Sequence, residues 1–194
     1  MTEFPPPSPP YLGPAAHDSG PGNKPVHRIV VHCTVSPCVT GQARRTAEWF
    51  RNPASQGSAH YVVDPGEVVQ VVLDGVIAWH APPNPHSIGV ELCDALLSPE
   101  WDRKHRDRWT DRNHTRMLRR AARIVARLCL AYDVPIERLT PADLKAGRRG
   151  LCGHVDVSRA FGQSSHWDPG PSFPWPEFLR LVHKRAAKIR KAAQ

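Results

Sequence analysis

The sequence of 194 residues lacks several features that would assign it to a class of protein at once. It has no apolar run of about 20 residues, which excludes a membrane-spanning helix. Residues 1–10 are acidic and proline-rich rather than basic and then apolar, so no secretory signal peptide is visible. No internal repeat is apparent. We therefore expect a protein that is made in the cytoplasm and does not export itself.

Cysteine is scarce. Five cysteines are present, an odd number, and no two of them form a C-x-x-C pair. This pattern favours a reduced chain in which most cysteines are small, buried, apolar residues. Cys33 follows His32 in an apolar run, so its side chain should point into the core and be inert.

Acidic residues are the minority among charged residues. The chain has 18 Asp and Glu against 26 Lys and Arg, a net charge of +8, and 20 of the 26 cations are Arg. A charge of this sign favours polyanionic partners, whether nucleic acid, anionic lipid or an anionic cell wall, and does not choose among them. The abundance of Arg, Ala, Gly and Pro resembles a GC-rich coding bias, which bears on origin and not on chemistry.

The chain nevertheless has enough apolar residues, 40% of the total, to build one domain of ordinary size. Eight prolines fall within residues 1–25 among Ser and Gly, and this stretch cannot bury enough apolar surface to order itself. We predict a flexible arm or linker at 1–25 and one folded domain at 26–194 that ends in a basic helix.

Strand patterns precede helical ones along most of the chain. Apolar, β-branched runs typical of strands lie at 26–34, 61–63, 68–72, 77–80 and 88–92. Helical periodicity appears at 42–51, 117–132, 140–147 and 175–189. The 61–63 and 68–72 runs flank a turn typical of a hairpin, and Thr110 or Asn113 is the predicted N-cap of the long helix. The predicted fold is one mixed α/β or α+β domain, with a central β-sheet flanked by α-helices.

Three segments place reactive side chains where predicted elements end. His32 closes a hydrophobic strand, His154 follows a glycine in a predicted loop, and Asp168 lies in a turn made rigid by proline and glycine. Taken singly, each residue fits a surface or capping role better than a ligand role. Together, two neutral imidazoles and a carboxylate meet the needs of a catalytic zinc ion, which keeps one position open and acidifies bound water. The fold must bring these segments together.

A fourth candidate is the carboxylate of Glu91. Side chains alternate along a strand, so in residues 87–92 the apolar residues should face the core while Ser87, Gly89 and Glu91 share the other face. Two small residues beside one carboxylate would leave room for a substrate. The alternative, a solvent-exposed strand glutamate, stays open on this evidence.

Six stretches, in order, resemble the zinc-dependent N-acetylmuramoyl-L-alanine amidases, a family that includes phage lysozyme-type amidases, bacterial anhydro-muropeptide amidases and peptidoglycan recognition proteins. They are I-V-V-H-C-T at 29–34, S-A-H-Y-V-V-D at 58–64, A-W-H-A at 78–81, S-I-G-V-E-L at 87–92, G-H-V-D at 153–156 and D-P-G-P at 168–171. The resemblance implies that the zinc ligands are His32, His154 and Asp168. It implies the fold of these single-domain amidases.

The resemblance also implies roles for other residues. Glu91 would be the catalytic carboxylate of the branch that lacks a catalytic tyrosine, because Ala59 occupies the tyrosine position. His166 stands where many members have a lysine and would stabilise the oxyanion, with a strength that depends on pH. Trp79 and His80 are candidates for substrate binding, although packing is the alternative for both. His60 would be a packing residue rather than a ligand.

The implied function is hydrolysis of the amide bond between N-acetylmuramic acid and L-alanine in peptidoglycan. We expect a bacteriophage endolysin that is made in the host cytoplasm, acts as a monomer on the cell wall after release, and causes host lysis. One alternative is a non-catalytic peptidoglycan-binding module of the same fold, against which the three filled ligand positions argue. The other is a basic nucleic-acid-binding protein, for which the sequence has no aromatic stacking platform or reader motif.

Overall fold

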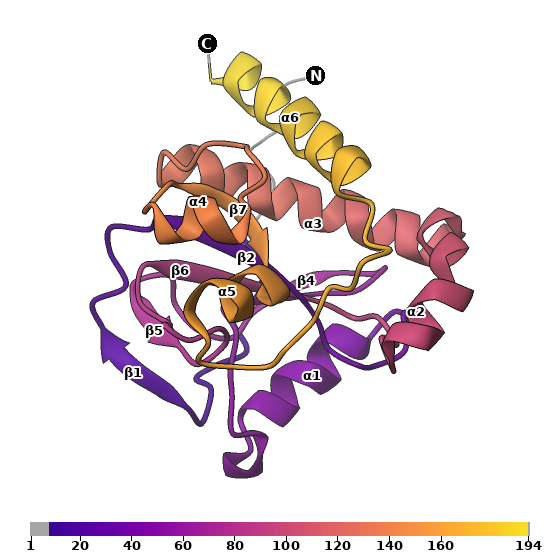
Figure 1. Cartoon of the computed structure of the whole chain (residues 1–194), viewed down its shortest axis with the longest axis horizontal. Coiled ribbons are helices and arrows are strands. Elements are labelled where there is room, and N and C mark those ends of the chain that lie inside the picture. Colours follow the sequence, from indigo (N-terminus) through magenta and orange to yellow (C-terminus); the bar gives the residue numbers. More distant parts are fainter. Residues whose placement is uncertain (1–7, 194) are drawn as a thin grey trace.

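A mixed five-stranded sheet forms the centre of the computed structural model, which describes residues 8–193 (Figure 1). The strand order is β4 (Val68–Gln70), β3 (Tyr61–Val63), β6 (Ser87–Leu92), β2 (Arg28–Cys33) and β7 (Gly150–Gly153). Neighbouring strands are parallel except β3 and β4, which form the predicted hairpin. A separate antiparallel pair joins β1 (Asp18–Pro21) to β5 (Val76–Ala78). The predicted class, a mixed sheet flanked by helices, is confirmed.

Helices cover the two faces of the sheet (Figure 1). The long helices α3 (Arg112–Ala131) and α6 (Trp175–Ala192) pack on each other and on one face. The short helices α4 (Pro141–Lys145) and α5 (His154–Phe161) lie on the other face. The remaining helical segments are α1 (Gln42–Phe50), η1 (Pro53–Ser55), α2 (Pro99–Lys104) and η2 (Arg106–Thr110). No described helix is both long and apolar enough to span a membrane.

Strand β2 is buried along its whole length because it lies between these two layers. Val31 and Cys33 belong to the large apolar cluster with α3 and α6, whereas Val30 packs in a smaller cluster with Val157 of α5. Alternation along the strand therefore places His32 on the α5 face. Cys33 points into the core as expected, and its burial raises the pKa of the thiol well above its usual value.

The described part of the predicted arm is packed on the domain, which corrects the boundary expected at residue 25. Within residues 8–25, Asp18–Pro21 forms β1, and the fully buried side chain of Asn23 donates to the Ser87 carbonyl at 2.7 Å. Proline-rich composition did not exclude order, because the domain supplies partners for this backbone and for Asn23. Residues 1–7 of the predicted arm, and residue 194 of the predicted domain, lie outside the described part of the chain.

The ends of two helices differ from the sequence-based expectation. The capping side chain of α3 belongs to Asp111, which accepts from the His114 backbone N–H at 2.8 Å, so neither Thr110 nor Asn113 is the N-cap. The expected loop around His154 is wrong, because His154 is the first residue of α5. Strand β7 and helices α2 and α5 had no periodicity long enough to predict them.

Candidate active site

Three side chains from distant parts of the sequence converge beside the end of β2. His32 comes from β2, His154 from the start of α5, and Asp168 from the loop before α6. One ligand atom from each lies within 4.8 Å of the other two, and all three residues are buried. The Asp168 carboxylate lies 3.1 Å from His32 Nδ1 and 3.4 Å from His154 Nδ1. The convergence that the zinc hypothesis requires is therefore present.

The backbone at the start of α5 holds the Asp168 loop in place. The Val155 N–H donates to the Asp168 carbonyl at 2.9 Å, and the Cys33 N–H donates to the carboxylate at 3.4 Å. Gly153 lies so close to this loop that an added Cβ would stand 2.6 Å from Pro169 Cδ. Any larger residue at 153 would push Asp168 away from the two histidines, so this glycine is required by close approach.

Glu91 stands beside His32 because β2 and β6 are parallel and in register at these two residues. Glu91 Oε1 lies 3.9 Å from His32 Nδ1. Its other oxygen, Oε2, is buried without a hydrogen-bond partner among the described residues. Burial raises the pKa of Glu91 to about 7, against the opposing effect of His32. The carboxylate is therefore suited to exchange a proton near neutral pH.

A hydrogen-bond chain behind His32 sets the orientation of its ring. The Ser87 hydroxyl donates to the Asn84 carbonyl at 2.5 Å, so its oxygen accepts from His80 Nε2 at 3.0 Å. His80 Nδ1 then accepts from His32 Nε2 at 3.1 Å. With Nε2 as the donor, the ring presents its Nδ1 to Asp168. His80 thus acts on the site through His32.

Because the single proton of a neutral His32 ring lies on Nε2 and is donated to His80, Nδ1 and the Asp168 oxygen that faces it are both acceptors. The position between them therefore requires a positive charge. Burial alone would lower the pKa of His32, but Glu91 and Asp168 outweigh it and raise the pKa. Without a metal, a proton fills this position, and a metal ion would replace that proton. Burial lowers the pKa of His154 to about 4, so its imidazole is neutral and able to ligate. Two nitrogens and one carboxylate fit zinc with an open coordination position.

His166 covers the site from the solvent side. Its side chain is 64% exposed and its ring stacks on His154, with centroids 4.3 Å apart and planes 8° apart. His166 Nδ1 lies 3.6 Å from Asp168 Oδ1, and the nearby carboxylate raises the pKa of His166. The ring is therefore close enough to face a substrate, and its catalytic role stays a prediction.

The remaining candidates lie outside the converging cluster. His60 is fully buried, accepts from the Gly89 N–H at 3.1 Å, and serves packing as expected. Trp79 is 40% exposed and its indole N–H donates to Ser19 at 2.7 Å, and its role toward substrate stays a prediction. His80 is buried with both ring nitrogens occupied, so the geometry indicates a positioning role rather than direct substrate binding.

The space expected for substrate above Gly89 is filled by protein. An added Cβ at Gly89 would stand 2.7 Å from Cγ of His80, so the glycine makes room for the His80 ring. The alternation in β6 is as predicted, since Ile88, Val90 and Leu92 enter the large apolar cluster. Sequence reasoning missed His80 as a positioning residue; the signal available was a histidine in A-W-H-A together with a glycine in the neighbouring strand.

Comparison with known proteins assigns this arrangement to a family. The sequence model of the N-acetylmuramoyl-L-alanine amidases matches residues 22–171, which are most of the chain and include every candidate site residue. The chain belongs to the N-acetylmuramoyl-L-alanine amidase family. The match contains both histidines and the aspartate of the cluster, together with Glu91.

Individual known proteins resemble the chain over most of its length. N-acetylmuramoyl-L-alanine amidase A of Achromobacter lyticus is 25% identical over 159 residues, which cover 74% of this chain and 78% of that protein. The hydrolase AmiA of Staphylococcus aureus shares the fold with a TM-score of 0.71 and 16% identity, over 96% of this chain and 86% of that one. A mutant endolysin from Bacillus subtilis aligns with a TM-score of 0.55 and 17% identity, over 90% and 99%.

Proposed function

We propose that this amidase is a zinc-dependent hydrolase that cuts the amide bond between the lactyl group of N-acetylmuramic acid and L-alanine in peptidoglycan. Family membership supports the peptidoglycan amidase activity. The observation that carries the zinc dependence is the buried cluster of His32, His154 and Asp168, whose ligand atoms lie within 4.8 Å of one another next to Glu91.

Each residue of the site has a separate role in the proposed hydrolysis. His32 Nδ1, a nitrogen of His154 and the Asp168 carboxylate would hold the zinc ion. When bound, zinc supplies Lewis acidity toward the scissile carbonyl and toward water. Glu91 takes a proton from the attacking water and passes it to the leaving amine nitrogen. A pKa of about 7 and an oxygen without a protein partner support this role.

His166 would donate a hydrogen bond to the oxyanion that develops during the attack. Its position over His154 and its exposed side chain support this role. We expect His166→Ala to slow turnover by about 10–100-fold without loss of zinc, measured by hydrolysis rate and metal analysis of the same sample. An unchanged turnover would remove His166 from the reaction, while a loss of zinc would make it a metal-holding residue instead.

The biological setting follows from the same chemistry. We propose a bacteriophage endolysin, made in the cytoplasm of the host and active on the cell wall as a monomer during host lysis. The similarity in fold to the Bacillus subtilis endolysin supports this setting. The non-catalytic wall-binding alternative has less support, because all three ligand positions and the Glu91 position are occupied.

Digestion of purified peptidoglycan tests the proposed function directly. We expect new N-terminal alanine with intact glycan strands, loss of activity after chelation, and recovery when zinc is added back. Metal analysis of the purified protein should give one zinc per chain. New reducing sugar ends without free alanine would contradict the amidase reaction, and full activity after complete chelation would contradict the zinc dependence.

A further inference from the structure

A groove of about 650 Å³ lies between α3 and α6, with η2 at one end. A second hollow of about 180 Å³ is lined by five arginines, Arg116, Arg119, Arg120, Arg123 and Arg185. Arg119 and Arg185 line both hollows, so the two are continuous. We call them together the basic groove. It belongs to the helices on the face of the sheet opposite to α5, and therefore lies away from the amidase site (Figure 1).

The charge of the basic groove is almost entirely of one sign. Eight basic side chains and a single carboxylate, that of Glu177, line the two hollows. Arg180 neutralises Glu177 through an ion pair at 2.7 Å. Within residues 8–193, the other seven basic side chains have no ion-pair partner. The whole chain carries a net charge of only +8, so this one groove concentrates most of the excess.

The spacing of the arginines suits a chain of phosphates. Residues three or four apart on a helix are neighbours on its surface, about 5–6 Å apart, so Arg116, Arg119 and Arg123 form a row along α3. The planar guanidinium group binds phosphate through two parallel hydrogen bonds, which makes arginine better suited than a point charge to this ligand. A row of unpaired guanidinium groups therefore fits a polymer with phosphate groups at regular intervals.

The apolar part of the groove argues against nucleic acid as the occupant. Single-stranded nucleic acids are held in part by exposed aromatic rings on which bases stack. The only aromatic residue of the groove is Trp109, which is 5% exposed, and Leu118 beside it is 3% exposed. This floor offers no face on which a base could stack, whereas a polyol or sugar chain between two phosphates needs no such face.

We infer that the basic groove binds an anionic phosphodiester polymer attached to the bacterial cell wall and so holds the enzyme on its substrate. This inference rests on the proposed function, because it takes the cell wall as the place of action. The groove and the amidase site lie on opposite sides of the sheet, so the polymer acts as a tether and does not enter the reaction.

Binding to a purified glycerol-phosphate polymer tests the groove without any hydrolysis. The groove variant replaces Arg116, Arg119, Arg123 and Lys184 with Gln; all four side chains are exposed. The control variant replaces Arg45, Arg51, Arg103 and Lys145, four exposed cations outside the groove, and so removes the same charge. At about 0.1 M salt we expect the groove variant to bind at least about tenfold more weakly than the parent, with a shallower salt dependence, and the control to stay within about twofold.

Equal losses in both variants would overturn the inference, because net charge alone would then explain binding. Tighter binding of single-stranded or duplex DNA than of the polymer, at matched charge, would also overturn it in favour of nucleic acid.

Hydrolysis assays separate this inference from the proposed function. Both variants should cleave a soluble muropeptide at the parent rate. On intact walls, the groove variant should be slower than the control, and the difference should vanish on walls whose phosphodiester polymers have been removed with hydrofluoric acid. Persistence of the difference on stripped walls would contradict the inference. Failure of the amidase reaction would show on the soluble muropeptide in every protein, including the parent, and would leave the polymer-binding result unaffected.

Discussion

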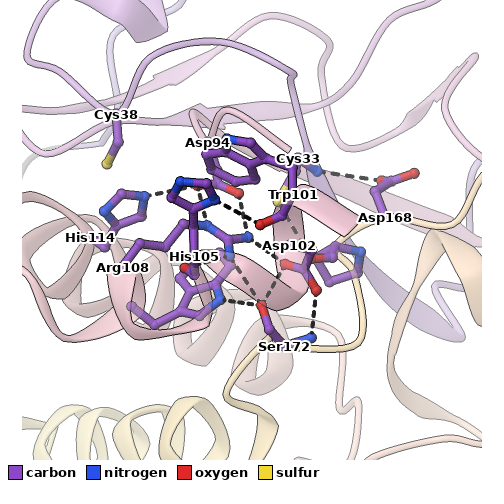
Figure 2. A network of polar contacts seen from close by, with 12 residues as sticks. Cys33, Cys38, Asp94, Trp101, Asp102, His105, Arg108, His114, Asp168 and Ser172 are labelled. Atoms are coloured by element: carbon purple, nitrogen blue, oxygen red, sulfur yellow. Dashed lines mark hydrogen bonds and ion pairs between the residues drawn. The ribbon is translucent and has the colours of Figure 1, made fainter. Parts of the chain in front are cut away.

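Two buried polar clusters lie close together in this protein and differ in one respect. The first is the amidase site of His32, Glu91, His154 and Asp168. The second is a network around Arg108, centred between Asp94 and Asp102, which Figure 2 shows next to Cys33 and Asp168. Both contain carboxylates that are buried, and both join residues that are distant in the sequence. Only in the second are all the carboxylate oxygens satisfied by the protein.

The Arg108 network is closed. Arg108 donates to both oxygens of Asp94 at 2.9 Å and pairs with Asp102 at 2.8 Å. His114 Nε2 lies 2.8 Å from Asp94, and Ser172 donates to Asp102 through its backbone N–H at 2.9 Å and through its hydroxyl. The guanidinium also lies over the indole rings of Trp101 and Trp109, 4.9 Å and 4.5 Å from their centroids. A network in which every carboxylate oxygen has a donor stabilises the fold. It leaves no polar atom free to bind a metal ion, water or substrate.

In the amidase site, by contrast, the protein leaves polar atoms without a partner. Glu91 Oε2 is buried without a partner in the described chain, and the contact between His32 Nδ1 and Asp168 requires a cation. The difference indicates that buried charge alone does not mark a reactive site. The marker is a polar atom that the protein leaves unsatisfied, because a metal ion, water or substrate must complete it.

Removal of a metal ligand should have the largest effect. We expect His154→Ala to empty the zinc site and to lower the rate of peptidoglycan hydrolysis by about 10⁴-fold or more, since both the Lewis acid and its orientation are lost. Metal analysis and digestion of purified walls measure the two effects. His183→Ala on the exposed face of α6 is the control and should keep zinc and activity. A fully active, zinc-loaded His154→Ala protein would contradict the assignment of His154 as a zinc ligand.

Glu91→Gln should separate catalysis from metal binding. We expect zinc to stay bound and turnover to fall by about 10²–10⁴-fold, because the proton acceptor is lost while the ligands remain. Folding raises the pKa of Glu91 to about 7, so the folded state binds more protons and the carboxylate destabilises the metal-free protein as pH rises from about 4.5 through 7.

Glu91→Gln should therefore raise the thermal unfolding midpoint of the metal-free protein more at pH 8 than at pH 5. An equal shift at both pH values would show that folding does not raise the pKa of Glu91. Parent-like turnover would show that Glu91 does not move the proton.

Arg108→Met should lower the stability of the fold and leave the zinc site intact. We expect a loss of about 3–5 kcal/mol in the free energy of unfolding, because Asp94 and Asp102 would be left buried without their shared cation. Denaturant unfolding measures this loss, and the zinc content of the folded fraction should be unchanged. Arg103→Met, at an exposed position of α2, is the matched control and should change stability by less than about 0.5 kcal/mol. If the two variants unfold alike, the network is not the stabilising cluster described.

The smallest effect is expected at His80. His80→Ala removes the acceptor for His32 Nε2, so the ring loses its fixed orientation and zinc affinity should fall by about 10–100-fold. Titration against a zinc-buffering chelator measures the affinity independently of activity, with the exposed His183→Ala as the reference. Nitrogen NMR of the zinc-loaded protein should show the His32 proton on Nε2 in the parent. Unchanged affinity would make His80 a packing residue.

The sequence predicted the elements of the fold wherever periodicity was long. The buried run of β2, the hairpin turn at 64–66 and the apolar stripe of α3 are each read from neighbouring residues alone. Strand β1, residues 18–21, could not be predicted in this way, because it forms only by pairing with β5, which is distant in the sequence. The start of α5 was missed because the helix has eight residues, too few for a clear apolar face.

The candidate site was only partly accessible to the same reasoning. The residue types of His32, His154 and Asp168 indicated zinc, but only the family resemblance indicated that they meet, because no local spacing relates β2 to the loop before α6. The partners of these residues were not predictable. The histidine of A-W-H-A and Gly89 were too weak a signal to place an imidazole above the glycine, and nothing around Asp94 shows that Arg108 reaches it.

His32 in β2 is paired with Glu91 in β6. The chemistry of the protein therefore depends on both residues facing the same side of the sheet. Connecting loops are free to lengthen or shorten during evolution without separating these two side chains. A single-residue insertion or deletion inside either strand has a different consequence, since it turns every later side chain to the opposite face. Such a change would leave a sheet that still forms while ligand and carboxylate face different layers, so length variation among relatives should concentrate between these strands and avoid their interiors.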